Sequence, residues 1–358
     1  MAIMISCLNY NFDTTENSIL KLNNSVAARR NFSYNFSMKK EEKIITCASF
    51  FAGVGGIDKG FENTNYFKTI YANEIDKNAC TTFELNFNLK VDCRDINKVS
   101  VNEIPGFDVM LAGFPCQAFS IAGYRQGFND EKGRGTLFFE LVRIMREKKP
   151  KVVFLENVKN LVGHDNGNTF RIILDYLQEC GYFVKYQVLN AKDYGNIPQN
   201  RERIYVVAFK SKQAYQRFEF PKPIQLTTKL SDVINYNKKE GKKYYYSEGN
   251  CSFYNILKEG MRNSETIYQW RRIYVRENKS GVCPTLTANM GTGGHNVPLI
   301  LTKYGIRKLT PHECFNIQGF PKDYKLPDIA KTHLYKQAGN SVVVSVIQRI
   351  AENIYKAL

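Results

Sequence analysis

The feature that most constrains the fold is the alternation of short apolar runs with amphipathic stretches between residues 44 and 210. Six runs are rich in aliphatic and aromatic residues and bounded by polar or turn residues, as buried strands of a parallel sheet are. They are IITCASFFAG, FKTIYANE, FDVMLAGF, KVVFLENV, FVKYQVLN and RIYVVAFK. Two stretches between them, LFFELVRIMREKKP and TFRIILDYLQECG, have apolar residues at helical spacing and end at Pro150 and Gly181. The series predicts an α/β fold built from βαβ units.

Outside that series the chain changes character three times. Residues 1–43 are rich in Asn and Ser, which predicts a poorly ordered extension of unknown role. Residues 211–305 are basic and irregular, and we expect a second, smaller domain there. Residues 306–358 contain KLTPHECFNIQGFP from residue 308, in which Thr310 is expected to cap a helix, and end in an amphipathic helix. A chain of 358 residues is long enough for this division into a large and a small domain.

The formal net charge is +16, from 50 basic and 34 acidic residues, and it favours nucleic acid as the partner. Charge alone does not identify a ligand, so a basic protein without a nucleic-acid partner remains an alternative. The nine cysteines form no CxxC pair, which suggests neither a zinc site nor a disulfide framework. No apolar run approaches the roughly 20 residues that span a bilayer, and the N-terminus lacks a signal-peptide pattern. We therefore expect a reducing, cytoplasmic setting.

A glycine-rich loop, FFAGVGGIDKGFE, follows the first run and opens a helix. Gly53, Gly55 and Gly56 allow the backbone to approach a ligand closely. Glu74 ends the next run, where a carboxylate can accept hydrogen bonds from ribose hydroxyls, and Asp95 is expected at a third strand end, near an adenine amino group. The loop has neither the GxGxxG spacing nor a lysine. This favours a nucleoside-bearing cofactor without phosphates.

Candidate chemical groups follow other strand ends. Cys116 lies in GFPCQAFS, just after a strand, where ligands and chemistry collect in open α/β sheets. Glu156 ends the run KVVFLENV, and Arg201 and Arg203 are spaced to point to one side of a strand. Each also has an ordinary structural interpretation: an inert loop thiol, a helix-capping carboxylate and a solvated charge cluster.

Five motifs in one order, FAGVGG, GFPCQAFS, ENV, QNRERIY and QAGNSVV, resemble those of the DNA cytosine-5 methyltransferases of bacterial restriction-modification type. The resemblance covers residues 45–210 and 306–358 and is weak between them. It implies a Rossmann-like, S-adenosylmethionine-dependent methyltransferase sheet in a catalytic and cofactor-binding domain at 44–210. It also implies a target-recognition domain at 211–305, and a hinge and C-terminal return to the catalytic domain at 306–358.

The same resemblance assigns roles to residues. Cys116 would add to carbon 6 of a flipped cytosine, Glu156 would bond ring nitrogen 3, and Arg203 the carbonyl oxygen, with Arg201 as a supporting cation. The cofactor would be S-adenosyl-L-methionine, which leaves as S-adenosyl-L-homocysteine. Its expected binding residues are Phe51, Gly53, Gly55, Gly56, Glu74, Ile75, Asp95, Ile96, Gly113, Pro115, Leu137, Asn340 and Ser341. Expected DNA-binding residues are Gln117, Ser120, Arg134, Arg271, Arg272, Thr285 and Leu286.

We expect double-stranded DNA as the substrate, no metal and no membrane, and a monomer. A cognate restriction endonuclease would be a functional partner and not a physical one. Two other functions stay open: the tRNA-directed branch of the same family, and a noncatalytic DNA-binding module that kept the fold. The recognition segment favours DNA over tRNA, and the presence of Cys116, Glu156, Arg201 and Arg203 argues against a noncatalytic module.

Overall fold

The computed structural model describes residues 44–115, 137–293 and 296–358. Residues Met1–Glu41 form one unit and Glu42–Leu358 the other, and the description below concerns the second unit. The expectation of a poorly ordered extension at 1–43 therefore lies outside the described residues.

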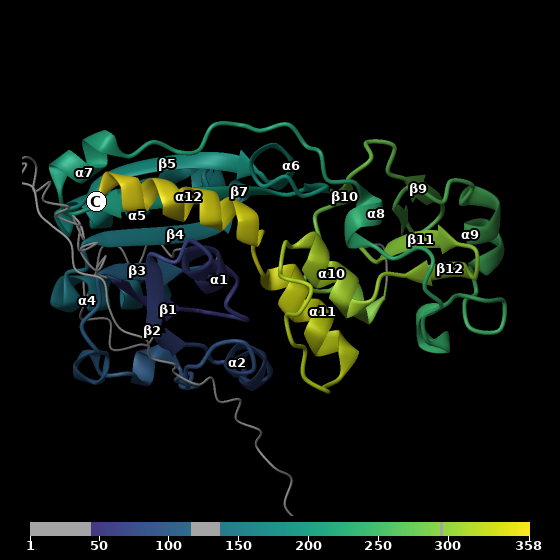
Figure 1. The fold of residues 1–358 in the computed structure, drawn as a ribbon, viewed down its shortest axis with the longest axis horizontal. Helices are drawn as coiled ribbons and strands as arrows, with labels where there is room; N and C mark the ends of the chain where they lie inside the picture. Colours follow the sequence, from purple (N-terminus) through teal and green to yellow (C-terminus); the bar gives the residue numbers. More distant parts are fainter. Residues whose placement is uncertain (1–43, 116–136, 294–295) are drawn as a thin grey trace, which may run out of the picture. The chain divides into compact units, whose positions relative to one another are not determined.

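A six-stranded sheet forms the centre of the first part of this unit, and each of the six predicted runs supplies one strand. The strand order is β2-β1-β3-β4-β7-β5 (Figure 1). The alternation of runs thus predicted the elements of the α/β fold correctly. Their bounds are β1 Ile45–Phe50, β2 Phe67–Asn73, β3 Val109–Ala112, β4 Val152–Val158, β5 Phe183–Asn190 and β7 Glu202–Phe209.

Strand β7 departs from the expected parallel arrangement. It lies between β4 and β5 and pairs antiparallel with both, with Val158 opposite Arg203 on one side and Leu189 opposite Arg203 on the other. The other neighbouring pairs in the sheet, β1 with β2, β1 with β3 and β3 with β4, are parallel. Because β7 runs backwards, its first residues lie at the edge where the parallel strands end.

Helices cover both faces of this sheet, since alternate strand residues point to opposite sides. On one face α4 (Leu137–Lys148) and α5 (Asn168–Glu179) pack on Val153 and Leu155 of β4. On the other face α1 (Gly56–Glu62) and α12 (Val344–Ala357) pack on Val152 and Phe154. Figure 1 shows α12, from the end of the sequence, lying along the sheet beside α1. The final amphipathic helix is therefore confirmed, and it completes a core begun by the first strand.

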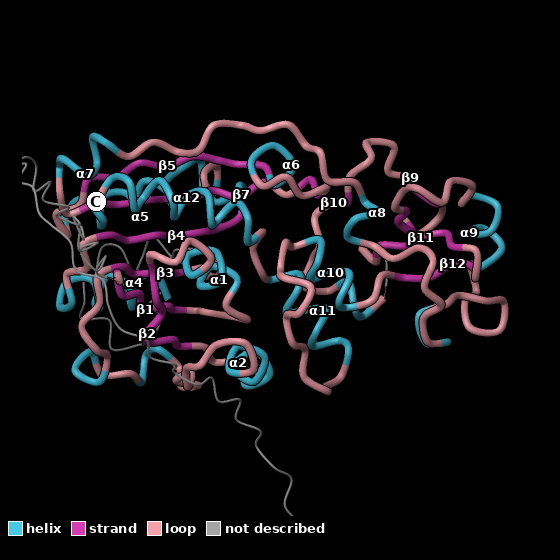
Figure 2. Tube along the Cα trace, in the orientation of Figure 1, coloured by secondary structure: helices cyan, strands magenta, loops and turns pink. Residues whose placement is uncertain are grey.

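The second part contains a four-stranded antiparallel sheet with the order β12-β11-β8-β9, connected by long loops (Figure 2). Two further strands, β6 and β10, form a short parallel pair. Three strands of the four-stranded sheet lie within residues 211–305, where a small domain is expected, and β12 lies at the end of that range. The strands are β6 Gln199–Asn200, β8 Tyr268–Trp270, β9 Val275–Glu277, β10 Cys283–Pro284, β11 Pro298–Thr302 and β12 Gly305–Lys308.

Seven further helices occur in the described residues. The capping box predicted at Thr310 is present: its hydroxyl accepts from the Glu313 N–H, and the Glu313 carboxylate accepts from the Thr310 N–H. Helix α7 and Phe218 lie after residue 210, where the second domain was expected to begin. They nevertheless pack in the core formed by the first sheet and α12. The helices are α2 Lys77–Glu84, α6 Ala191–Tyr194, α7 Lys212–Arg217, α8 Leu230–Val233, α9 Tyr254–Gly260, α10 Pro311–Ile317 and α11 Lys331–Asn340, with 3-10 turns at Ile96–Lys98, Val101–Glu103, Lys159–Leu161, His164–Gly167, Lys242–Tyr244 and Met290–Thr292.

Candidate active site

A cavity of about 570 Å³ lies at the edge of the sheet where the parallel strands end. That edge is where ligands bind in open α/β folds. Residues from the first strand to the segment before α12 line it, so distant parts of the sequence meet there. Of the expected cofactor-binding residues, twelve line the cavity: Phe51, Gly53, Gly56, Glu74, Ile75, Asp95, Ile96, Gly113, Pro115, Leu137, Asn340 and Ser341.

Gly55 is not among the lining residues. It has a φ of 75°, and a Cβ atom there would collide with the rings of Phe83 and Phe87. Glycine is needed at this position for helix packing and not for approach to a ligand. Gly53, with a φ of 57° and open space around it, does line the cavity. Phe51 precedes it with a φ of 54°, a conformation that costs a bulky residue energy and turns the backbone sharply after β1.

Two carboxylates reach the cavity from neighbouring segments. Glu74, directly after β2, accepts from the backbone N–H of Gly53 at 2.8 Å and of Asp76 at 2.9 Å. Each oxygen keeps a second lone pair for a ligand hydroxyl. Asp95 follows a single parallel bridge between Asn73 and Asp92, and not a strand as expected, and it caps a 3-10 turn. The N–H groups of Asn97 that donate to Asp95 lower the pKa of that carboxyl.

The lining also contains two polar groups that need a partner. Ser341 Oγ and Gln337 Nε2 are buried and bond to nothing within the described ranges. A buried polar atom without a partner is costly, and a polar ligand in the cavity would provide one. These groups, the Glu74 carboxylate and the half-buried Phe51 ring fit a ligand with a nucleoside and an amino-acid portion. The cavity thus fits S-adenosylmethionine.

Glu156 and Arg203 form an ion pair beside the cavity. Glu156, near the end of β4, is 8% exposed, and its Oε1 lies 3.2 Å from Arg203 Nε at the start of β7. Burial raises the pKa of Glu156, and the charges of Arg203 and Arg201 offset part of that rise. A raised pKa keeps a proton available on a carboxyl group at higher pH, which suits a general acid.

A side-chain hydrogen bond fixes the residues just before Cys116. Asn157, the residue after Glu156, donates its amide N–H to the carbonyl of Phe114 at 2.8 Å. This bond ties the end of β4 to the residues after β3. In the sequence Asn157 stands within the ENV motif, and its position next to Glu156 is the one signal of its role. Cys116 itself, with Gln117, Ser120 and Arg134, lies outside the described residues.

Arg201 is placed differently from Arg203. It is 2% exposed, and its guanidinium donates to backbone carbonyls of Leu286, Gly339 and Ser341. Burial lowers the pKa of Arg201 to about 9. The hydrogen bonds of Arg201 thus join it to backbone segments around the cavity, whereas Arg203 pairs with Glu156.

The expected DNA-binding residues of the second part divide into two groups. Arg272 and its neighbour Arg271 form the turn between β8 and β9, where Arg272 is exposed with a φ of 73°. Leu286, in contrast, is 2% exposed and packs in a core with residues of α2 and α10, so its side chain cannot contact DNA. The Thr285 hydroxyl donates to the Asn200 carbonyl at 2.7 Å. The Thr-Leu pair anchors this segment.

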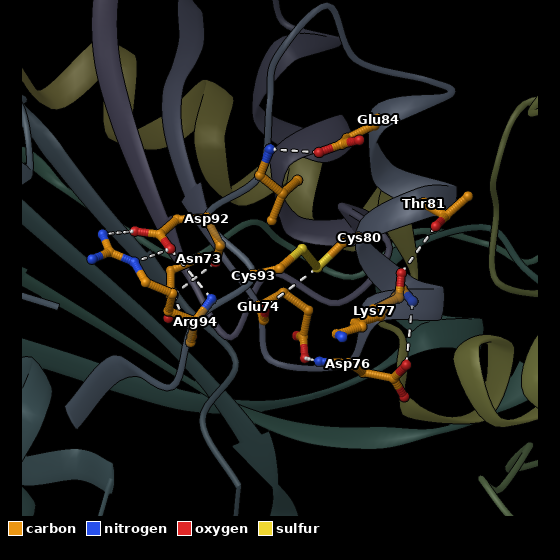
Figure 3. Close-up of a disulfide and its surroundings, with 12 residues drawn as sticks. Asn73, Glu74, Asp76, Lys77, Cys80, Thr81, Glu84, Asp92, Cys93 and Arg94 are labelled. Atoms are coloured by element: carbon orange, nitrogen blue, oxygen red, sulfur yellow. Dashed lines mark hydrogen bonds and ion pairs between the residues drawn. A yellow bond between two sulfur atoms is a disulfide. The ribbon is translucent and has the colours of Figure 1, made fainter. Parts of the chain in front are cut away.

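A disulfide joins Cys80 in α2 to Cys93, with Cα atoms 6.5 Å apart (Figure 3). The spacing of the cysteines suggests no disulfide framework, and for this pair that expectation is wrong. The spacing of 13 residues gives no CxxC signal, and only the turn of the chain through α2 brings the two together. Ala79 and Asp95, close to the two cysteines in sequence, line the cavity.

Solved structures share the fold of this chain. It matches a DNMT2 mutant of Spodoptera frugiperda with a TM-score of 0.67 and 20% identity, over 87% of this chain and 99% of that one. This likeness shows the fold of the chain. No helix of the described ranges is long and apolar enough to cross a membrane, and no group of metal-binding side chains occurs in them.

The family follows from sequence comparison. Residues 45–356 match the family of C-5 cytosine-specific DNA methylases, and the chain belongs to it. It is 64% identical to the type II methyltransferase M.Bsp6I of Bacillus sp. (strain RFL6), over 88% of this chain and 100% of that protein. It is 41% identical to the type II methyltransferase M.HhaI of Haemophilus parahaemolyticus, over 86% of this chain and 93% of that protein. The chain is thus a DNA cytosine-5 methyltransferase that uses S-adenosylmethionine.

Proposed function

We propose that this chain is the modification enzyme of a type II restriction-modification system and methylates carbon 5 of one cytosine in a short duplex site. The observation that carries the proposal is the 64% identity to a type II methyltransferase over that protein's whole length. The Glu156–Arg203 pair beside the cavity supplies the chemical support. A cognate endonuclease would be its functional partner.

In this proposal the Cys116 thiolate adds to carbon 6 of the cytosine, which makes carbon 5 nucleophilic. The carboxyl group of Glu156 donates a proton toward ring nitrogen 3 and neutralises the charge that the addition develops. The burial that raises the pKa of Glu156 supports this role. Asn157 holds the Phe114 carbonyl and thereby the start of the loop that carries the thiol.

Arg203 orients the carboxyl group of Glu156 and binds the carbonyl oxygen of the base. When bound, S-adenosylmethionine supplies the electrophilic methyl carbon. Glu74 would accept the ribose hydroxyls, Phe51 would lie against the adenine, and Ser341 and Gln337 would bond polar groups of the ligand. All four residues line the cavity.

A base inside a duplex is covered by its stacked neighbours, so the cytosine must be flipped into the site. Gln117 would fill the space that it leaves, and Ser120 and Arg134 would contact the DNA. Arg271 and Arg272 are candidates for base reading because arginine pairs bidentately with guanine. We propose that the enzyme acts as a monomer in the cytoplasm, bound to the nucleoid through DNA.

Bisulfite sequencing of a plasmid from a host that expresses the protein tests this function. We expect 5-methylcytosine at one short recurring sequence, and none with Cys116→Ser, whose affinity for S-adenosylhomocysteine should stay within a few-fold of wild type. A duplex with 5-fluorocytosine at the target should trap a covalent adduct. Methylation of an exocyclic amine, or of tRNA in place of DNA, would contradict the proposal.

A further inference from the structure

Arg201 bonds three carbonyl groups from two different regions of the chain. Its Nη1 lies 2.9 Å from the carbonyl oxygen of Leu286, in the recognition segment. Its Nη2 lies 3.1 Å from the carbonyl oxygen of Gly339 and also bonds that of Ser341. Gly339 and Ser341 line the methyl-donor cavity. One guanidinium therefore holds the segment between β9 and β11 of the recognition sheet and the segment that closes the cavity.

The acceptors on the cavity side explain why a cation is needed. Gly339 lies in the last turn of α11, and Ser341 is its C-terminal capping residue. The last carbonyls of a helix have no partners within it and carry the negative end of its dipole. The Ala338 carbonyl accepts from the Gln318 side chain at 2.6 Å. Arg201 donates to the carbonyls of Gly339 and Ser341. A guanidinium is both charged and wide enough to reach several of them.

A second side chain, that of Gln199, also bonds the backbone of Leu286. Gln199 is fully buried, accepts from the Leu286 N–H at 3.3 Å, and donates to the Ile317 carbonyl at 2.9 Å. The strand pair β6–β10 places Cys283 opposite Gln199. The backbone of Gly339 lies so close to Thr287 and Ala288 that no Cβ would fit between them.

We propose that Arg201 is a positioning residue that sets the recognition segment 283–288 and the cavity-closing segment 337–341 in register. This inference rests on the proposed function, since it takes the part of the chain that contains β8 and β9 as the part that reads bases. Arg201 acts through three backbone carbonyls and not on the base. Its loss therefore affects cofactor binding and sequence discrimination together, whereas loss of Arg203 affects the chemical step.

The test uses the full chain with Arg201→Lys and Arg203→Lys as a matched pair. Lysine keeps the charge of both sites but cannot reach three carbonyls. Calorimetric titration with S-adenosylhomocysteine, without DNA, gives the dissociation constant. Steady-state kinetics on the duplex found by bisulfite sequencing, and on a duplex with one flanking base pair changed, give kcat, KM and the discrimination ratio.

We expect Arg201→Lys to raise the dissociation constant and to lower the discrimination ratio, each by roughly tenfold, because buried charge-assisted hydrogen bonds are lost. Arg203→Lys should lower kcat and leave the dissociation constant within about twofold. If Arg201→Lys lowers kcat alone, as Arg203→Lys does, Arg201 is an active-site cation and the proposal is wrong.

Gln199→Met provides an independent variant if Arg201→Lys fails to fold. It removes the bond to the Leu286 N–H but leaves the carbonyls of Gly339 and Ser341 with Arg201. It should lower the discrimination ratio more than the affinity for S-adenosylhomocysteine; an unchanged ratio would contradict the proposal. If the wild-type chain binds S-adenosylhomocysteine but methylates no DNA, the proposed function fails, while the effect of Arg201→Lys on that binding still tests the cavity half of the inference.

Discussion

The disulfide between Cys80 and Cys93 makes a quantitative prediction about stability. It closes a loop over a sequence separation of 13 residues. Restricting the unfolded chain over a loop of that length stabilises the fold by about 3 kcal/mol in the chain-entropy treatment. A change of 1 kcal/mol shifts the Tm of domains of roughly 150–250 residues by about 2–4 °C. The Cys80→Ser/Cys93→Ser double variant should therefore melt several degrees below the oxidised wild type.

Calorimetry of wild type with and without dithiothreitol measures the same difference. A dithiol supplies two electrons and two protons, so that the disulfide becomes two thiols and the dithiol becomes a cyclic disulfide. The double variant is the control, since its Tm should not respond to the reductant. Alkylation of free thiols followed by mass spectrometry of the two peptides reports whether the bond exists. An equal Tm in both buffers, with both cysteines alkylated in the oxidised sample, would refute the pairing.

The disulfide also has a local effect to measure. Glu74 and Asp95 enter the cavity from the two segments that the disulfide connects, and Asn73 holds the second of them through bonds to the carbonyls of Asp92 and Arg94 (Figure 3). Bacterial cytoplasm keeps most thiols reduced. Affinity for S-adenosylhomocysteine should be measured in both states, and we expect weaker binding in the reduced state because the two segments gain freedom.

Two further predictions concern buried charges. Burial raises the pKa of Asp58 to about 7, although Ser49 and Thr69 donate to it, so the folded state holds a proton that the unfolded state releases near pH 4. Stability should therefore fall as pH rises from about 4 to about 7 and then level off, and urea unfolding of Asp58→Asn should show a weaker fall; an unchanged profile would contradict this. Arg307, fully buried, makes two bonds of 2.7 and 2.8 Å to Glu313, so Arg307→Met should cost about 3–5 kcal/mol of unfolding free energy by the same method, and a cost below about 1 kcal/mol would contradict the pairing.

The sequence predicted the strands and the main helices because their signal is local. The run KVVFLENV reads as a buried strand whatever its neighbours do, and Thr310 caps its helix through residues three positions away. The direction of β7 was not predictable, because a run of apolar residues carries no sign of which way it enters a sheet. The pairing of Cys80 with Cys93 and the burial of Leu286 likewise depend on contacts between distant segments.

The residues that line the cavity were predicted better than the side chains that hold the lining segments in place. Glu74, Asp95 and Ser341 were found from motifs that follow strand ends or return late in the chain. Arg201 was paired with Arg203 because the two alternate along a strand, yet only one of them bonds Glu156. Gln199 and Gln337 stand in the motifs QNRERIY and QAGNSVV, but their roles were not predicted, since a buried amide looks like any polar residue in a sequence.

Helix α12 and Ser341 have a consequence for how the protein is made. The strands of the first sheet are translated long before α12, which packs beside α1 on one face of the sheet, and before Ser341, which lines the cavity. A nascent chain therefore exposes the apolar side of that sheet until α12 has been synthesised. Methyl-donor binding, and with it any modification of DNA, therefore requires that Ser341 and α12 have left the ribosome.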